Sequence, residues 1–211
     1  YVYRQSGQID KAIAALEKLL ALKLHLPEVY YYLIAFYGDQ GDLDKAVTAA
    51  NDGLAKYPKD KELLYQAAVV EEKIGHRQRA LELMEQVLAI DPDHPDALNF
   101  VAYHHAEKGT ELESALSKAQ RALSSKKNGY IIDTLGWIYF KLGRYDESRE
   151  QLEEATSLLP EDPVILEHLG DLYRALTLWE MAAEAYKRAL ELDPLAETVQ
   201  EKLSDLPETT Q

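Results

Sequence analysis

The residues of this chain that could carry out chemistry are its histidines and its many carboxylates. The histidines are His25, His76, His94, His104, His105 and His168. No two of them have the H-E-x-x-H spacing of a zinc site, and there is no cysteine to complete one. His104 and His105 are adjacent, so on a helix they point about 100° apart and are expected to pack rather than to share a metal. We therefore predict no metal site.

The paired acids and the glycines give no support for catalysis either. Glu71–Glu72 and Glu153–Glu154 fall at helical spacings that reach solvent, and no pocket is implied around them. A phosphate-binding loop needs closely spaced glycines after a strand, whereas the glycines here recur at wide intervals. Without a thiol nucleophile, a metal site or a nucleotide motif, the sequence predicts a protein that is not an enzyme and has no cofactor.

Composition narrows the class of partner. The 211 residues include 37 acidic and 23 basic side chains, and the net charge of −14 opposes binding to nucleic acid. No uninterrupted apolar stretch approaches the roughly 20 residues that cross a bilayer, so no membrane span is expected in this chain. The absence of cysteine fits a reducing cytoplasm and a bacterial periplasm equally well, which leaves the compartment open.

A fixed period sets the spacing of the structural elements. Five glycines are each 34 residues apart, namely Gly7, Gly41, Gly75, Gly109 and Gly143. Seven of the eight prolines follow the same period in two further phases: Pro58, Pro92, Pro160 and Pro194 in one, and Pro27, Pro95 and Pro163 in the other. A repeat of this length predicts a stack of similar units rather than one globular core.

Each unit is predicted to be a pair of antiparallel helices, called helix A and helix B below. Between the glycine and proline positions the apolar residues share one helix face, as in Leu43, Ala46, Val47, Ala50 and Leu54. The glycine follows helix A, where a left-handed residue is needed. One proline phase ends helix B and the other begins the next helix A, where a missing N–H is tolerated.

The period and the residues within it resemble the tetratricopeptide repeat (TPR) family. Unit 163–196 carries the motif residues Leu169, Gly170, Tyr173, Ala182, Tyr186, Ala189 and Pro194. Unit 129–162 carries Leu135, Gly136, Tyr139, Gly143, Tyr145, Ala155 and Pro160, with Ser148 in place of the usual alanine. Units 27–60, 61–94 and 95–128 depart more, with Ile34, Ala68 and Ala102 replacing the small glycine and His105 replacing the tyrosine.

The resemblance implies an all-α, right-handed superhelical solenoid of antiparallel helix pairs. It covers a half repeat at 1–26, the five full repeats, a capping helix at 197–206 and a tail at 207–211. Unit 95–128 needs a one-residue insertion near Thr110 to align its alanines. Because residue 1 falls within a helix A, we expect further repeats and any targeting segment to lie outside this sequence. The chain is also similar to bacterial, in part envelope-associated, TPR proteins, so cytoplasm and periplasm both stay open.

The family resemblance also implies which residues face a partner, because helix A positions 2, 5, 6, 9, 12 and 13 line the concave groove. Position 5 holds Tyr31, Tyr65, Asn99, Asp133 and Glu167, and position 9 holds Ala35, Val69, Tyr103, Trp137 and Asp171. An aromatic patch is expected from Phe100, Tyr103, Tyr130, Trp137 and Phe140, with Trp137 facing outward; the alternative is that such rings are core. The charged residues Lys141, Glu167, Asp171 and Arg174 are predicted to receive a basic or polar partner segment; the alternative is that they are solvated surface charges.

The predicted function is a non-enzymatic scaffold or adaptor that binds a peptide or protein segment in this groove. A clamp for the C-terminal carboxylates of Hsp70 or Hsp90 is disfavoured, because position 5 holds no Lys or Arg. Two alternatives stay open at this point. One is a self-association module, and the other is a glycan-binding platform of a polysaccharide export or secretion system, in which sugars stack on the aromatic groove.

Overall fold

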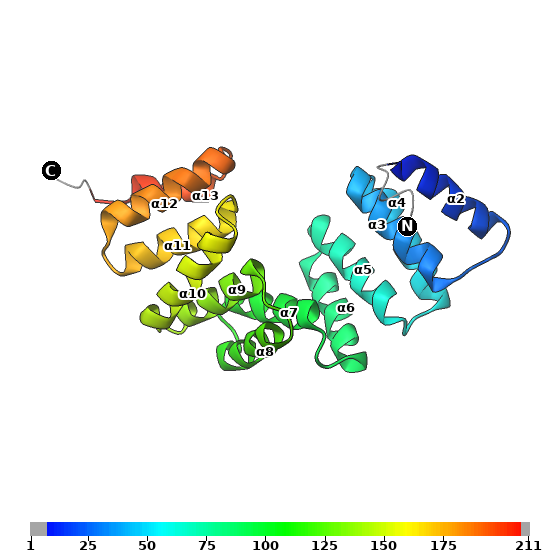
Figure 1. Ribbon diagram of the computed structural model, residues 1–211, viewed down its shortest axis with the longest axis horizontal. Coiled ribbons are helices and arrows are strands. Elements are labelled where there is room, and N and C mark those ends of the chain that lie inside the picture. The colour runs from blue at the N-terminus through cyan, green and yellow to red at the C-terminus, as the bar shows by residue number, and fades with distance from the viewer. Residues whose placement is uncertain (1–7, 208–211) are drawn as a thin grey trace. The chain divides into compact units, whose positions relative to one another are not determined.

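The computed structural model describes residues 8–207, and these residues form twelve helices and no strand (Figure 1). The first predicted glycine, Gly7, and the tail residues 208–211 lie outside the described residues. The helices are α2 (Ile9–Ala21), α3 (Pro27–Gln40), α4 (Leu43–Lys56), α5 (Lys61–Lys73), α6 (Arg77–Ile90), α7 (Pro95–Lys108), α8 (Leu112–Ser125), α9 (Gly129–Lys141), α10 (Tyr145–Leu158), α11 (Pro163–Ala175), α12 (Trp179–Leu192) and α13 (Glu197–Ser204). The predicted all-α fold class is confirmed.

The helices pack as successive pairs, α3 with α4, α5 with α6, α9 with α10 and α11 with α12. The chain divides into two compact units, unit 1 at Tyr1–Ala97 and unit 2 at Leu98–Gln211. The boundary falls within the first turn of α7. Unit 1 therefore contains α2 to α6, unit 2 contains most of α7 and all of α8 to α13, and each is described by itself.

The turn inside each pair has the backbone conformation that the glycine period requires. Gly41, Gly75, Gly109 and Gly143 all have positive φ, between 64° and 83°. Helix B begins two residues after the glycine in α4, α6 and α10, but three residues after it in α8. Glu111, with φ 48°, supplies the additional residue next to Thr110. The structure thus contains the one-residue insertion that the alignment of repeat 95–128 required.

The start of each helix A is fixed by a side-chain cap or by proline. The side chains of Asp60, Asn128 and Asp162 accept hydrogen bonds from the first backbone N–H groups of α5, α9 and α11. Prolines occupy the first position of α3, α7 and α11. These caps set where each helix A begins, and so they determine which of its residues share a face.

Close contacts tie each helix A to its neighbours. A Cβ added to Gly170 would lie 2.4 Å from Cε1 of Tyr186, so only glycine allows α11 and α12 to approach this closely. The hydroxyl of Tyr173 donates to Glu153 of α10 at 3.0 Å, and Tyr37 donates in the same way to Glu17 of α2 at 2.6 Å. Burial and this hydrogen bond raise the pKa of Tyr173 to about 12. Tyr37 and Tyr173 therefore link one repeat to helix B of the repeat before it.

Thr177 stands at the next 34-residue step after Gly143 and also has a left-handed backbone, with φ 60°. A β-branched side chain is strained in this region. We expect Thr177→Gly to raise the free energy of unfolding by about 1 kcal/mol. Glycine relieves the backbone strain of the folded state, and this gain exceeds the stabilisation of the unfolded chain by the entropy that glycine adds. Urea unfolding followed by circular dichroism measures this change. Gly143→Thr is the matched control and should destabilise; an unchanged or lower stability of Thr177→Gly would contradict the prediction.

Candidate functional site

The candidate site is the helix A face of compact unit 2. This is the side of α7, α9 and α11 that carries positions 2, 5, 6 and 9 of each 34-residue repeat. On α9 these positions are Tyr130, Asp133, Thr134 and Trp137, whose helical spacing places them on one face. Helices α9 and α11 pack against each other. Side chains at positions 5 and 9 of α9, Asp133 and Trp137, meet His168 of α11.

His168 of α11 lies at the centre of this face and is buried. Its Nδ1 is 2.9 Å and 3.1 Å from the two carboxylate oxygens of Asp133, which is also buried. Burial alone would lower the pKa of His168, but the carboxylates of Asp133 and Glu107 outweigh burial and raise it. The arrangement favours a buried imidazolium–carboxylate pair between α9 and α11.

Trp137 is packed into the same cluster, with its ring centroid 4.1 Å from that of His168 and 4.8 Å from that of Phe140. Its Nε1 donates to Glu107 at 2.7 Å, and Nζ of Lys141 lies 4.7 Å from the ring centroid. Only 6% of Trp137 is exposed. The expectation that this ring faces outward is therefore wrong, because the next helix A places an imidazole over it.

A second polar cluster joins α11, α12 and α13. Nζ of Lys202 donates to Glu167 and to Asp171 at 2.6 Å each, and the hydroxyl of Tyr186 donates to the other oxygen of Asp171 at 2.6 Å. Burial would lower the pKa of Lys202, but these two hydrogen bonds raise it overall. Burial and the bond to Asp171 also raise the pKa of Tyr186. The predicted acids Glu167 and Asp171 are thus bound by a lysine of the chain itself.

The two clusters share one register. Asp133 and His168 are 35 residues apart, and so are Glu167 and Lys202. In both cases an acid at position 5 pairs with a base at position 6 of the next helix A. Asn99 and Thr134 have the same spacing, but Asn99 Oδ1 is buried without a hydrogen-bond partner and Thr134 Oγ1 donates to the backbone of α9. The acid–base pairs between positions 5 and 6 of successive helices A therefore begin at Asp133.

Sequence reasoning missed several members of these clusters. They are His168, Glu107, Lys202 and Tyr186. The acid–base spacing of 35 residues, one more than the period, was present in the sequence and is the signal that could have identified His168 and Lys202.

Tyr130 and Val164 are the exposed apolar residues of the helix A face, 57% and 45% exposed. They lie at position 2 of the repeats that contain α9 and α11. In the three preceding repeats this position holds Glu28, Glu62 and Asp96. Sequence reasoning selected Tyr130 but not Val164, although the change from acidic to apolar residues at one position was visible. Lys141 and Arg174 are also exposed on α9 and α11.

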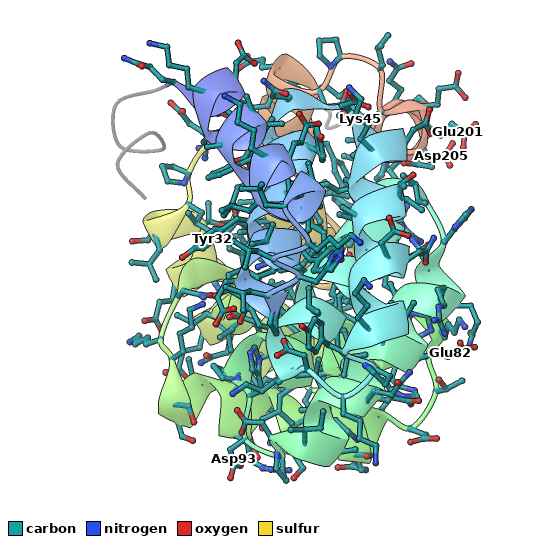
Figure 2. All side chains as sticks on the ribbon, turned by 90° about the vertical axis from the view of Figure 1, so that its right-hand side faces the viewer. Tyr32, Lys45, Glu82, Asp93, Glu201 and Asp205 are labelled. Carbon is teal, nitrogen blue, oxygen red and sulfur yellow. The ribbon has the colours of Figure 1, made fainter. Side chains whose placement is uncertain are left out.

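The remaining predicted residues are partly buried. In unit 2, Tyr103 lies 6.1 Å from the ring of His168, and Phe100 lies on α7. In unit 1, Tyr31 lies 4.8 Å from the ring of Tyr32, which Figure 2 labels, and Tyr65 lies 5.1 Å from the ring of His94. Burial raises the pKa of both Tyr31 and Tyr65.

Within residues 8–207, no three histidine, aspartate or glutamate side chains are grouped so that they could hold a metal ion. In the same range, no helix combines the length and the apolar character needed to cross a bilayer.

Comparison with known proteins identifies the repeat. A family profile described as tetratricopeptide repeat matches residues 65–130 and 134–197, and two more profiles of the same description match residues 27–70 and 1–25. This chain belongs to the tetratricopeptide repeat family. The predicted resemblance to TPR proteins, bacterial ones included, is thereby confirmed.

Curated relatives of this TPR protein include two bacterial proteins. It is 27% identical to the TPR repeat-containing protein PA4667 of Pseudomonas aeruginosa, in a match that covers 81% of this chain and 29% of the relative. It is also 27% identical to the TPR repeat-containing protein YpiA of Bacillus subtilis, covering 94% of this chain and 47% of the relative. The chain thus spans less than half the length of either relative.

Solved TPR structures share the fold. TTC0263 from Thermus thermophilus matches with a TM-score of 0.64 at 24% identity, covering 85% of this chain and 97% of that structure. YrrB, described as a TPR protein with an unusual peptide-binding site, matches with a TM-score of 0.63 at 18% identity, covering 89% of this chain and 96% of that structure.

The stability of this TPR protein should depend on the protonation of His168. Its folded pKa is raised above the value of about 6.5 for an unfolded histidine, so the folded state holds the proton more tightly. The resulting stability is fully present below the unfolded pKa and is lost as the pH rises through the folded pKa. We expect His168→Gln to lower the free energy of unfolding by about 3 kcal/mol at pH 6 and by clearly less at pH 9.

Urea unfolding of both proteins at the two pH values measures this difference. His76 is the exposed N-cap residue of α6, so His76→Gln serves as the control for the loss of an imidazole outside the buried cluster. An equal loss of stability at pH 6 and pH 9 would show that the charge of His168 does not contribute.

Proposed function

We propose that this protein is a non-catalytic scaffold that holds a segment of another protein on the helix A face of unit 2. The observation that carries the proposal is that Tyr130 and Val164 are exposed beside the polar cluster of Asp133, His168, Trp137 and Glu107. The TPR fold supports a protein-interaction scaffold in general. YrrB, which is described as having a peptide-binding site, is consistent with this use of the fold.

Tyr130 and Val164 supply the binding free energy in this proposal. An amphipathic ring and an aliphatic side chain lose little entropy when they are covered, and covering each contributes about 1–2 kcal/mol. The buried acids are already paired within the chain, so a partner need not neutralise them. Lys141 and Arg174, which are exposed, add long-range attraction for acidic groups of the partner.

The other predicted groove residues have supporting or peripheral roles in this proposal. Trp137, Phe140 and Asp133 hold α9 against α11 and so fix the direction of Tyr130 and Val164. Asn99, Phe100 and Tyr103 of α7 extend the contact surface towards the preceding repeat. Tyr31 and Tyr65 are partly buried rings at the same repeat position in unit 1, and they take no part in the proposed surface.

The alternatives are less well supported. Sugar stacking needs an open aromatic face, whereas the ring of Trp137 is covered by His168, Phe140 and Lys141. A clamp for a C-terminal carboxylate is opposed by Asp133 and Glu167 at position 5. Self-association through Tyr130 and Val164 would use the same surface, and a concentration-dependent mass in solution would reveal it.

The test places a photo-crosslinking residue, p-benzoylphenylalanine, at position 130 in cells that express the protein, with the same residue at position 181 as the control. Met181 is 39% exposed on α12 and lies off the helix A face. A partner crosslinked from position 130 and not from position 181 is the expected result. Equal crosslinking from both positions, or none from position 130, would count against the proposed surface.

The affinity of the crosslinked partner then tests the two side chains individually. We expect Tyr130→Ala to weaken binding about tenfold, which corresponds to about 1.4 kcal/mol, and Val164→Ala to weaken it by a smaller factor. Met181→Ala should leave the affinity unchanged. Calorimetric titration of the purified proteins gives these values, and circular dichroism checks that each variant keeps its helices.

A further inference from the structure

We infer that the surface of α11 and α12 covered by α13 is a binding site for a lysine-bearing amphipathic helix, and that α13 is its occupant within the chain. The inference rests on the proposed function, since Glu167 and Asp171 belong to the same helix A face, and it specifies a class of partner. A helix of another protein with the same pattern of side chains would take the place of α13.

The apolar part of this site shows what shape of ligand it accepts. Val199 of α13 is buried in the cluster formed by α11 and α12, and Leu203 packs against the same cluster. Val199, Lys202 and Leu203 are spaced i, i+3 and i+4, so they project from one face of the helix. The site therefore accepts two apolar side chains one turn apart with a cation next to the second.

The polar part of the site selects the cation. Asp171 is only 6% exposed, and its two oxygens are bonded to Tyr186 and to Lys202. A buried carboxylate that loses its cation is left without compensation for its lost hydration, so a purely apolar helix cannot replace α13. One ammonium nitrogen lies 2.6 Å from both Glu167 and Asp171, a geometry that suits the compact, three-donor lysine head group.

The hold of α13 on the site is limited. It has eight residues, one buried side chain and no side-chain hydrogen bond at its N-cap. Isolated helices of this length are not stable in water, so α13 depends on Val199, Leu203 and the lysine contact to stay in place. An element with so few buried contacts opens at a low free-energy cost compared with the rest of the unit. A longer helix with the same three side chains can therefore compete with it.

A labelled peptide with the sequence of residues 195–207 is the probe, because it carries the side chains that fit the site. The receptor is the full chain with Val199→Asp, which loosens α13 but keeps Glu167, Asp171 and Tyr186. We expect fluorescence anisotropy to show at least tenfold tighter binding of the peptide to this variant than to the unchanged chain. Equal binding to both chains would overturn the inference that α13 covers the site.

Peptide variants test the lysine. The peptide with Lys202→Gln should bind the Val199→Asp chain at least tenfold more weakly, whereas the peptide with Glu201→Gln, which also changes one charge, should bind at least as well as the original. Equal binding of the Lys202→Gln peptide would rule out recognition of the cation.

A second chain variant covers the case in which Val199→Asp disturbs α12 as well. Full-length Lys202→Gln keeps the apolar contacts of α13, and amide hydrogen exchange should then become at least tenfold faster in residues 197–204 while α11 stays protected. Unchanged exchange in α13 would show that the lysine does not secure it.

The outcome is separable from that of the proposed function. Adding Tyr130→Ala to the Val199→Asp chain should not change peptide binding, because Tyr130 lies on α9 and the site is formed by α11 and α12. A protein that fails to bind partners through Tyr130 could therefore still bind the peptide, and the reverse result is equally distinct.

Discussion

A helix pair in this chain cannot bury its apolar face alone, and the rest of the structure depends on that constraint. In unit 2, α9 lies against α11, and this contact covers residues at positions 5, 6 and 9 as well as apolar ones. Polar groups at these positions lose contact with water, so they need partners from the adjacent helix. The Asp133–His168 pair and the bridge from Lys202 to Glu167 and Asp171 satisfy this need in two successive contacts.

The elements could be predicted because their ends depend on local backbone chemistry. Glycine in a left-handed turn and proline at a helix end act within a few residues, so a 34-residue spacing of Gly41, Gly75, Gly109 and Gly143 is readable without any tertiary information. Thr177 departs from this chemistry, yet the turn forms there, because the packing of α11 on α12 outweighs the local strain. The extra residue at Glu111 was also predictable, since it restores the alignment of the alanines in α8.

The site was harder to predict because its contacts depend on two helices at once. The unit position of Trp137 gives the direction in which it leaves α9, but not that His168 of α11 lies over it. The partner of Glu167 and Asp171 is 31 to 35 residues further along the chain, so the acids alone were compatible with solvent, with another protein or with Lys202. At position 2 of α9 and α11, Tyr130 and Val164 are exposed, and there the exposure of Tyr130 followed the expectation. This position holds acidic residues in three repeats and apolar ones in two, so the stack does not depend on one residue type there.

The acid–base register also makes the two sides of a helix A different in charge, and this fixes the order in which such helices can pack. Helix α13 places Lys202 against α11 and carries the exposed Glu201, and the exposed Asp205 directly follows the helix. These two acids repeat the spacing of Glu167 and Asp171 34 residues later, and Figure 2 labels them next to each other. A helix of this kind has a cationic side towards the N-terminal neighbour and an anionic side towards the C-terminal one, so two such helices attract each other in one order and repel in the other. Duplication of a single 34-residue segment would therefore copy both halves of the joint, and the array could lengthen during evolution without a new interface having to arise.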